Sequence, residues 1–108
     1  MKKSDNELIA EFDELYSEKV HGKMLWTHKD NNGESWSYAK HELEYDKSWD
    51  WLMPVVEKIE SLGYSTRILD VGMGIEGKII IERFGKTKIE GTYNTVISFI
   101  KLYNLNKK

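Results

Sequence analysis

The sequence contains no cysteine. Disulfide bonds, thiolate nucleophiles and zinc sites built from cysteine are therefore excluded. No apolar run approaches the roughly 18 to 20 residues that a helix requires to cross a bilayer. The first twelve residues, MKKSDNELIAEF, lack the apolar core of a signal peptide. We therefore expect a cytoplasmic protein that makes no contact with a membrane.

A strong excess of one charge is also missing. The formal net charge is −2, and there is no dense tract of lysine and arginine, so direct binding of nucleic acid is not expected. The acidic excess lies in residues 1–64, whereas basic side chains outnumber acidic ones in residues 65–108. Such an asymmetry can mark an end that faces an anion, although small chains also show it without functional consequence.

A chain of 108 residues is expected to form one domain, because two halves would have cores too small to be stable alone. Ser4 and Glu7 form the pattern of a capping box. Apolar residues then recur at helical spacing, which predicts a helix that ends near His21 and Gly22. Its inward-facing residues would be Leu8, Ile9, Phe12, Leu15, Tyr16 and Val20.

Residues 23–45 have the pattern of a β-hairpin. Lys23–His28 has the composition of a strand, and Asp30–Gly33 is a strong turn signal. Ser35–Tyr45 then predicts a second strand that is long or bent.

Residues 48–64, SWDWLMPVVEKIESLGY, predict a second helix that ends at Gly63. Asp50 is the favoured N-cap, because a start at Ser48 would place Pro54 inside the helix at a cost of about 3 kcal/mol. Trp49 would then precede the helix, with part of its ring exposed. The buried stripe would be Trp51, Leu52, Val55, Val56, Ile59 and Leu62.

The last part of the chain predicts two strands and a third helix. Ser65–Val71 and Lys78–Phe84 would be strands joined by a flexible turn at Gly72–Gly77, and the isoleucines of the second suggest a central strand buried on both faces. Thr87 and Glu90 form a second capping box. Inward-facing residues of the helix would be Ile89, Tyr93, Val96, Ile97, Ile100 and Tyr103, and residues 104–108 would fray.

The predicted order of elements is α-β-β-α-β-β-α. It indicates an α+β fold, a single-domain sandwich of residues 1–108 in which helices pack on a mostly antiparallel sheet.

Residues 67–77, RILDVGMGIEG, superficially resemble the first motif of S-adenosylmethionine-dependent methyltransferases and also satisfy G-x-G-x-x-G. In those folds a helix follows the glycines directly and completes a βαβ unit. Here a predicted strand follows Gly77, and too few residues remain for a doubly wound sheet. We interpret the segment as a hairpin turn and expect no cofactor.

Gly85, Lys86 and Thr87 match the end of a P-loop, but its upstream glycine is replaced by Ile80. A weaker hypothesis remains, in which a helix N-terminus bearing Lys86, Thr87 and Lys88 holds a phosphate through its amides and dipole. An ordinary capped helix with solvated lysines is the more common arrangement.

No catalytic or metal-binding pattern is present in the sequence. His21, His28 and His41 lie in three segments without the spacing of a metal site. No serine lies in a nucleophile elbow. We therefore expect no metal site and no enzymatic activity.

Aromatic residues are concentrated in residues 26–51. A core of this size does not easily bury all of them, and Trp and Tyr are enriched at interfaces and on stacking surfaces. Either Trp51 and one tryptophan of the hairpin belong to the core while the others cover its edge, or at least one of these residues belongs to a contact surface. The candidates for that surface are Trp26, Trp36, Tyr38 and Trp49.

Residues 48–60, SWDWLMPVVEKIE, and residues 88–104, KIEGTYNTVISFIKLYN, resemble a family of small proteins found in bacteriophages, prophages and their hosts. Some of these are similar to the phage ABA-sandwich type of domain. The segment Asn6–Phe12, NELIAEF, is also similar, whereas residues 23–41 and the glycine-rich segment match least. The resemblance implies a phage or mobile-element origin and a helix–sheet–helix sandwich. No activity is established for the family, so it implies no mechanism.

The leading hypothesis is a phage accessory protein that binds a host protein in the host cytoplasm and inhibits a defence component, as an anti-CRISPR-like protein would. An acidic surface favours association with a basic partner. The alternative is a small-molecule binder that sequesters a nucleotide signal, with Lys86–Lys88 on the phosphates and an aromatic ring on the base. Enzymatic activity is the third hypothesis. The sequence is also compatible with a homodimer.

Overall fold

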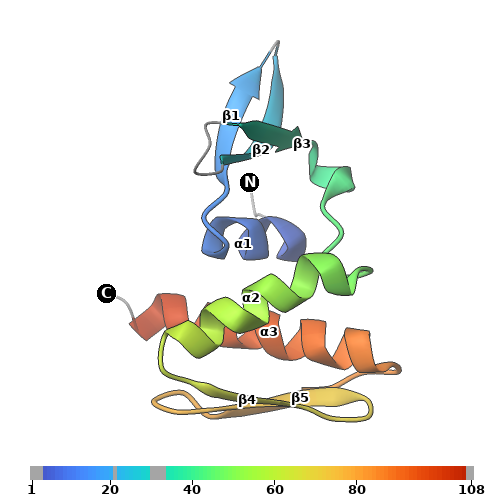
Figure 1. The fold of residues 1–108 in the computed structure, drawn as a ribbon, viewed down its shortest axis with the longest axis vertical. Coiled ribbons are helices and arrows are strands. Elements are labelled where there is room, and N and C mark those ends of the chain that lie inside the picture. The colour runs from blue at the N-terminus through green and yellow to red at the C-terminus, as the bar shows by residue number, and fades with distance from the viewer. Residues whose placement is uncertain (1–3, 21, 30–33, 107–108) are drawn as a thin grey trace. The chain divides into compact units, whose positions relative to one another are not determined.

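The computed structural model describes residues 4–20, 22–29 and 34–106. It confirms the α+β class, with helices packed on antiparallel sheets (Figure 1). It has more strands than the sequence predicts, in the order α-β-β-β-α-β-β-β-α. The chain divides into two units, Met1–Glu44 and Tyr45–Lys108, which are described one at a time. That residues 1–108 form a single domain stays a prediction.

Helix α1 (Asp5–Phe12) begins at the predicted capping box. The Glu7 amide donates to the Ser4 hydroxyl (3.3 Å), and the Ser4 amide donates to the Glu7 carboxylate (3.1 Å). The helix ends well before the predicted end at residue 21, because Glu14 takes a left-handed conformation with φ 67°. The Leu15 amide then bonds to the Ala10 carbonyl (2.9 Å), which closes the helix end.

The residues predicted as the second half of that helix form a strand instead. β1 (Tyr16–Val20), β2 (Lys23–Lys29) and β3 (Ser35–Tyr38) make an antiparallel sheet in that order. The pairing of β2 with β3 confirms the predicted hairpin, whose turn at 30–33 lies outside the described residues. The second strand ends at Tyr38, before a 3-10 turn, η1 (Lys40–Glu42), so it is shorter than predicted.

Helix α2 (Trp49–Ser61) opens unit 2, and it corrects the predicted cap. The N-cap is Ser48, whose carbonyl accepts from the Leu52 amide (3.0 Å), so Pro54 lies inside the helix. Pro54 and Asp50 are both exposed, so water can solvate the Asp50 carbonyl that the proline leaves without its helical partner.

The stripe of α2 follows the prediction at its centre and departs from it at both ends. Leu52, Val55, Val56 and Ile59 are buried, as the periodicity predicts. Trp51 is only half-buried, with its ring edge-to-face on buried Tyr45 (centroids 5.1 Å apart). Leu62 is exposed rather than buried.

A three-stranded antiparallel sheet follows, in the order β4 (Ser65–Ile68), β5 (Gly72–Glu76) and β6 (Ile81–Phe84). The predicted flexible turn at Gly72–Gly77 is therefore mostly the central strand. A Cβ on Gly72 would overlap the Arg83 carbonyl oxygen and lie 2.6 Å from the Phe84 ring, so the neighbouring strand leaves space only for glycine at this position. The isoleucine run is not a central strand, since Ile80 is 75% exposed.

Helix α3 (Lys88–Asn106) covers β5 and β6, while α2 packs beside it and contacts β4 (Figure 1). The Thr87 hydroxyl accepts from the Glu90 amide (3.1 Å), which confirms Thr87 as the predicted N-cap. A Cβ on Gly91 would overlap the Val71 carbonyl oxygen, so glycine allows the helix to approach β5 closely. The stripe includes Gly91, Thr92, Thr95 and Phe99, which are buried but were not predicted, and Ile89, Tyr93 and Tyr103 are only half-buried.

Thr95 joins this helix to two strands. Its fully buried hydroxyl donates toward the Met73 carbonyl (2.9 Å) and accepts from the Arg83 amide (3.1 Å). The hydroxyl also lies 3.0 Å from the Gly91 carbonyl of its own helix. Met73 and Arg83 are register partners, so one side chain connects α3 to the pair of strands beneath it.

Thr95→Val removes this hydroxyl with little change of volume. We expect a loss of about 1 to 3 kcal/mol in the free energy of unfolding, because buried strand groups lose a partner. Thr92→Val is the matched control, since the equally buried Thr92 hydroxyl donates only to the Lys88 carbonyl of its own helix (2.9 Å). Denaturant unfolding measures both variants. Equal losses would show that the contact between helix and strands contributes nothing.

Ile59→Ala tests the buried stripe of α2. Ile59 is fully buried, and we expect a loss of about 2 to 5 kcal/mol because the substitution leaves a cavity. Trp49→Ala should cost much less, since Trp49 is only half-buried in the first turn. Thermal unfolding compares the two. A larger loss for Trp49→Ala would place that ring in the core.

Candidate ligand pocket

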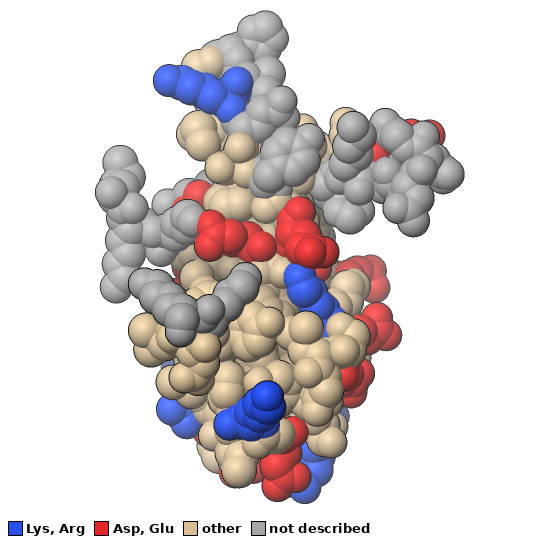
Figure 2. Space-filling view, turned by 90° about the vertical axis from the view of Figure 1, so that its left-hand side faces the viewer, with Lys and Arg blue, Asp and Glu red and all other residues tan. Residues whose placement is uncertain are grey.

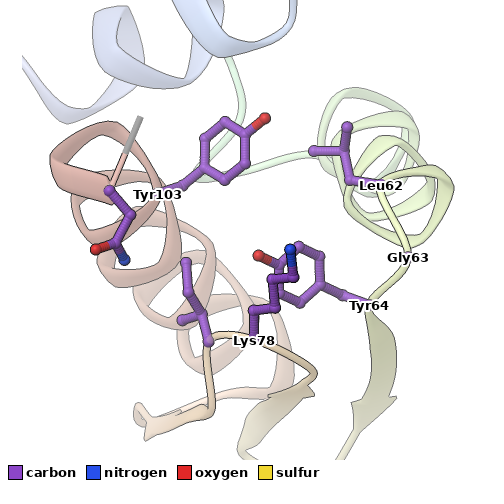
Figure 3. A pocket seen from close by; sticks show the side chains of 7 residues that line it. Leu62, Gly63, Tyr64, Lys78 and Tyr103 are labelled. Atoms are coloured by element: carbon purple, nitrogen blue, oxygen red, sulfur yellow. The ribbon is translucent and has the colours of Figure 1, made fainter. Parts of the chain in front are cut away.

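An opening lies at one end of unit 2, where the C-terminal ends of α2 and α3 meet two turns of the sheet. Gly63, with φ 99°, turns the chain from α2 into β4, and its amide bonds to the Glu60 carbonyl (3.0 Å). The opening has a volume of about 700 Å³. It is lined by Leu62, Gly63, Tyr64, Lys78, Ile79, Tyr103 and Asn106 (Figure 3).

Two tyrosine rings on the lining, Tyr64 and Tyr103, pack on a third aromatic ring behind them. Phe99, which is fully buried, contacts Tyr64 edge-to-face, with ring centroids 4.9 Å apart and planes at 83°. The same Phe99 ring stacks on Tyr103, with centroids 5.7 Å apart and planes at 20°. Such pairs contribute about 0.5 to 1.5 kcal/mol beyond the area that they bury. The buried ring therefore fixes both tyrosines at the rim.

Gly77 supplies the space that Tyr64 occupies. A Cβ on Gly77 would lie 2.6 Å from Cδ1 of the Tyr64 ring. The ring therefore lies flat against the backbone that follows β5, and any larger residue at position 77 would displace it.

Three polar side chains converge on the opening. Figure 3 shows Lys78 and Tyr103 reaching into it from the segment after β5 and from α3, and Tyr64 from the start of β4. Among the described residues, the Lys78 ammonium has no ion-pair or hydrogen-bond partner. The Asn106 amide and the Tyr64 hydroxyl likewise have none in this part of the chain. These groups are available to a ligand.

Among the residues that the structure describes, Lys78 is the single charged side chain on the lining. The C-terminal ends of α2 and α3 also lie here, and the last carbonyls of a helix carry a partial negative charge. These partial negative charges offset part of the positive electrostatic potential of Lys78. Figure 2 shows that uncharged side chains make up most of this face of unit 2, with separate basic and acidic groups among them. The site therefore suits a ligand with no more than one anionic group.

Three of the four predicted aromatic contact residues lie on one side of the sheet of unit 1, because Trp26 pairs with Tyr38 and Trp36 lies two positions before Tyr38 on the same strand. Trp26 is 4% exposed, and its indole N–H donates to the Glu7 carboxylate (3.1 Å), so it supports the fold of unit 1. Trp36 is 45% exposed, and Tyr38 is half-buried. Both lie on the same side of the edge strand β3. Trp49 is half-buried in unit 2.

The predicted anion-binding residues lie at the other end of α3. Lys86, Thr87 and Lys88 are all exposed around its N-terminus. The Thr87 hydroxyl caps the Glu90 amide, as it would in an ordinary helix. Nothing in their geometry distinguishes a phosphate site from a capped helix.

Comparison with protein-family models, with curated proteins and with solved structures finds no match to this chain. Within residues 4–20, 22–29 and 34–106, no three side chains are placed to hold a metal ion. No helix in the described part of the chain has the length and apolar character to span a membrane.

The pocket is not apparent from the sequence, because its residues come from three separate segments. Tyr103 was predicted to face inward, but Tyr64, Lys78 and Asn106 were not singled out. Tyr64 directly follows the helix-ending Gly63, and Lys78 directly follows Gly77. Each position suggests an exposed polar group at a turn. Neither position shows that the two segments meet.

Gly77→Ala tests how Tyr64 is held. We expect the ring to be displaced from Phe99, because the new methyl group would overlap Cδ1, and the Tyr64 ring protons should shift in a ¹³C–¹H NMR spectrum. Gly74→Ala in the neighbouring strand is the control. Its Cβ would meet the Glu82 carboxylate at an ordinary 3.4 Å, so it should alter stability by less than about 1 kcal/mol. Unchanged Tyr64 signals in Gly77→Ala would contradict this packing.

Proposed function

We propose that this protein binds, without converting it, a small ligand that has a planar ring and one anionic group, of the class of nucleoside monophosphates. The observation that carries the proposal is the opening in which two tyrosine rings flank a lysine with no partner among the described residues. The rings offer faces for stacking, and Lys78 offers a charge. The Asn106 amide can both donate to and accept from the edge of a base.

The size of the opening supports a ligand of this class. Its volume of about 700 Å³ lies in the range of roughly 300 to 1,000 Å³ that is typical of small-molecule sites. Apolar walls with a few polar groups that fix orientation are also typical of such sites. Leu62 and Ile79 contribute the apolar part.

A single phosphate matches the charge of the site better than two or three. One ammonium group can pair with one phosphate, and the two helix C-termini disfavour further negative charge. Lys86 and Lys88 cannot assist, because α3 rises about 1.5 Å per residue and separates Lys88 from Asn106 by about 27 Å. A mononucleotide is shorter than this distance. We therefore place the phosphate on Lys78.

A second candidate function is binding to a host protein, as an accessory protein of phage origin that inhibits a defence component. The exposed Trp36 on an edge strand favours it, because a large exposed ring beside unpaired strand groups is typical of a contact surface. The resemblance of residues 48–60 and 88–104 to phage proteins is the reason to place it in a bacterial host. The cytoplasm is the compartment that both functions require.

Titration with AMP, followed by calorimetry, tests the ligand proposal. We expect Lys78→Gln to weaken binding by about 5- to 10-fold, which corresponds to an ion pair of about 1 kcal/mol. Lys86→Gln is the control and should bind within about twofold of the wild type. ADP should bind no more than about threefold more tightly than AMP, because the site holds one ammonium. Equal weakening by both lysine variants would contradict the placement.

Affinity capture from bacterial lysate separates the second candidate from the first. If a host protein is the partner, the wild type should retain it in stoichiometric amount, and Trp36→Ala should lose it while AMP binding is unchanged. Absence of AMP binding together with a Trp36-dependent partner would favour the second function. Turnover of a nucleotide would contradict both.

A further inference from the structure

The sheet of unit 2 has one face that no element of this unit covers. Both helices pack on the other face, where Met73 and Ile75 are buried (Figure 1). On the uncovered face, Arg67, Gly74 and Glu82 form one row across the three strands, because Arg67 pairs with Gly74 and Gly74 pairs with Glu82. Opposite charges therefore lie on the two edge strands, with a glycine between them.

The two charged side chains meet above that glycine. Arg67 Nη2 and Glu82 Oε2 are 3.9 Å apart, and the side chains are 74% and 46% exposed. A Cβ on Gly74 would lie 3.4 Å from the same Glu82 oxygen and 3.9 Å from the same Arg67 nitrogen. At such exposure the pair stabilises the monomer little, so both groups can re-pair with an external partner.

Apolar side chains lie at both ends of this face. The Phe84 ring lies over Gly72 and is 55% exposed, and Ile80 is the most exposed large apolar residue of the described chain. A hollow of about 330 Å³ lies between Ile80 and the charged row. Burial of these exposed apolar groups against another surface would be favourable, because it removes them from water.

We propose that this face associates with a second copy of the chain, face to face, about a two-fold axis parallel to the strands. The charge pattern selects this arrangement. An axis parallel to the strands places Arg67 of each copy opposite Glu82 of the other and Gly74 opposite Gly74. An in-plane axis perpendicular to the strands would place Arg67 opposite Arg67 and Glu82 opposite Glu82, which is unfavourable. An isologous contact of this kind closes at two copies.

Gly74, at the centre of the row, lets the two sheets approach each other. Stacked sheets normally lie about 10 Å apart, separated by the side chains of both faces. Gly74 adds no side chain of its own at the centre. Once Arg67 and Glu82 leave their own pair for the other copy, the two new ion pairs and the flanking side chains of Phe84 and Ile80 can contact the facing sheet. Ile80 of the second copy falls over the Ser65–Glu76 pair, beside the hollow.

The association should be weak. Three strands of four or five residues cover on the order of 200 Å² of sheet, whereas a standard stable interface buries about 800 Å² on each partner. A dimer of this size forms at high concentration and dissociates on dilution. Its charge pairs also make it sensitive to salt.

Sedimentation equilibrium of the full chain with charge-exchanged variants tests the proposal. Wild type should dimerise as its concentration rises, and Arg67→Glu and Glu82→Arg should each be monomeric, because each variant places like charges opposite each other. An equimolar mixture of the two variants should form a heterodimer, because two carboxylates of one variant then face two guanidinium groups of the other. The expected loss for each single variant is at least tenfold in association constant, with recovery in the mixture.

The mixture separates the proposal from an effect inside one monomer, because mixing cannot repair an intramolecular defect. Failure of the mixed variants to associate would overturn the proposal. It would be overturned equally by a wild type that stays monomeric at millimolar concentration, or by a dimer that persists unchanged in both single variants. A monomer that instead retains a different protein through Phe84 would assign the face to another occupant. The AMP titration is read independently, since none of the four outcomes involves Lys78.

Discussion

The close contact of α3 with the central strand of unit 2 is the constraint on which the rest of this unit depends. Gly91 removes the side chain that would otherwise overlap the Val71 carbonyl. At that short separation the buried Thr95 hydroxyl reaches both Met73 and Arg83. A buried hydroxyl is costly unless it is hydrogen-bonded, so the fold is specific for the one placement of α3 that satisfies it.

Both candidate surfaces follow from that placement. Phe99 lies one turn after Thr95 on the same helix, and its ring fixes Tyr64 and Tyr103 at the end of the sheet. Because α3 and α2 pack on one face, the row of Arg67, Gly74 and Glu82 stays uncovered on the other. A pocket at the end of the layers and an open sheet face are therefore consequences of one packing arrangement.

The features predicted correctly from the sequence are those that depend on interactions between residues close together in the chain. The capping box at Ser4 and the centre of the α2 stripe are predicted correctly, because capping and helical periodicity depend on residues a few positions apart. The early end of α1 is not, since Glu14 adopts a left-handed conformation that its residue type does not favour. Gly72 and Gly74 indicate a turn from the sequence alone, and only the tertiary structure shows that they form a strand in which the Arg83 carbonyl oxygen and the Phe84 ring occupy the space beside Gly72. The pocket was missed for the same reason, because its residues meet only through tertiary packing.

The most direct test of the central claim is a set of intermolecular NOEs between the base protons of AMP and the protein. If the opening at the end of unit 2 is the ligand site, NOEs should connect the base to the rings of both Tyr64 and Tyr103, and to no aromatic ring of unit 1. NOEs to Trp36 or to the residues around the N-terminus of α3, with none to the two tyrosines, would contradict it.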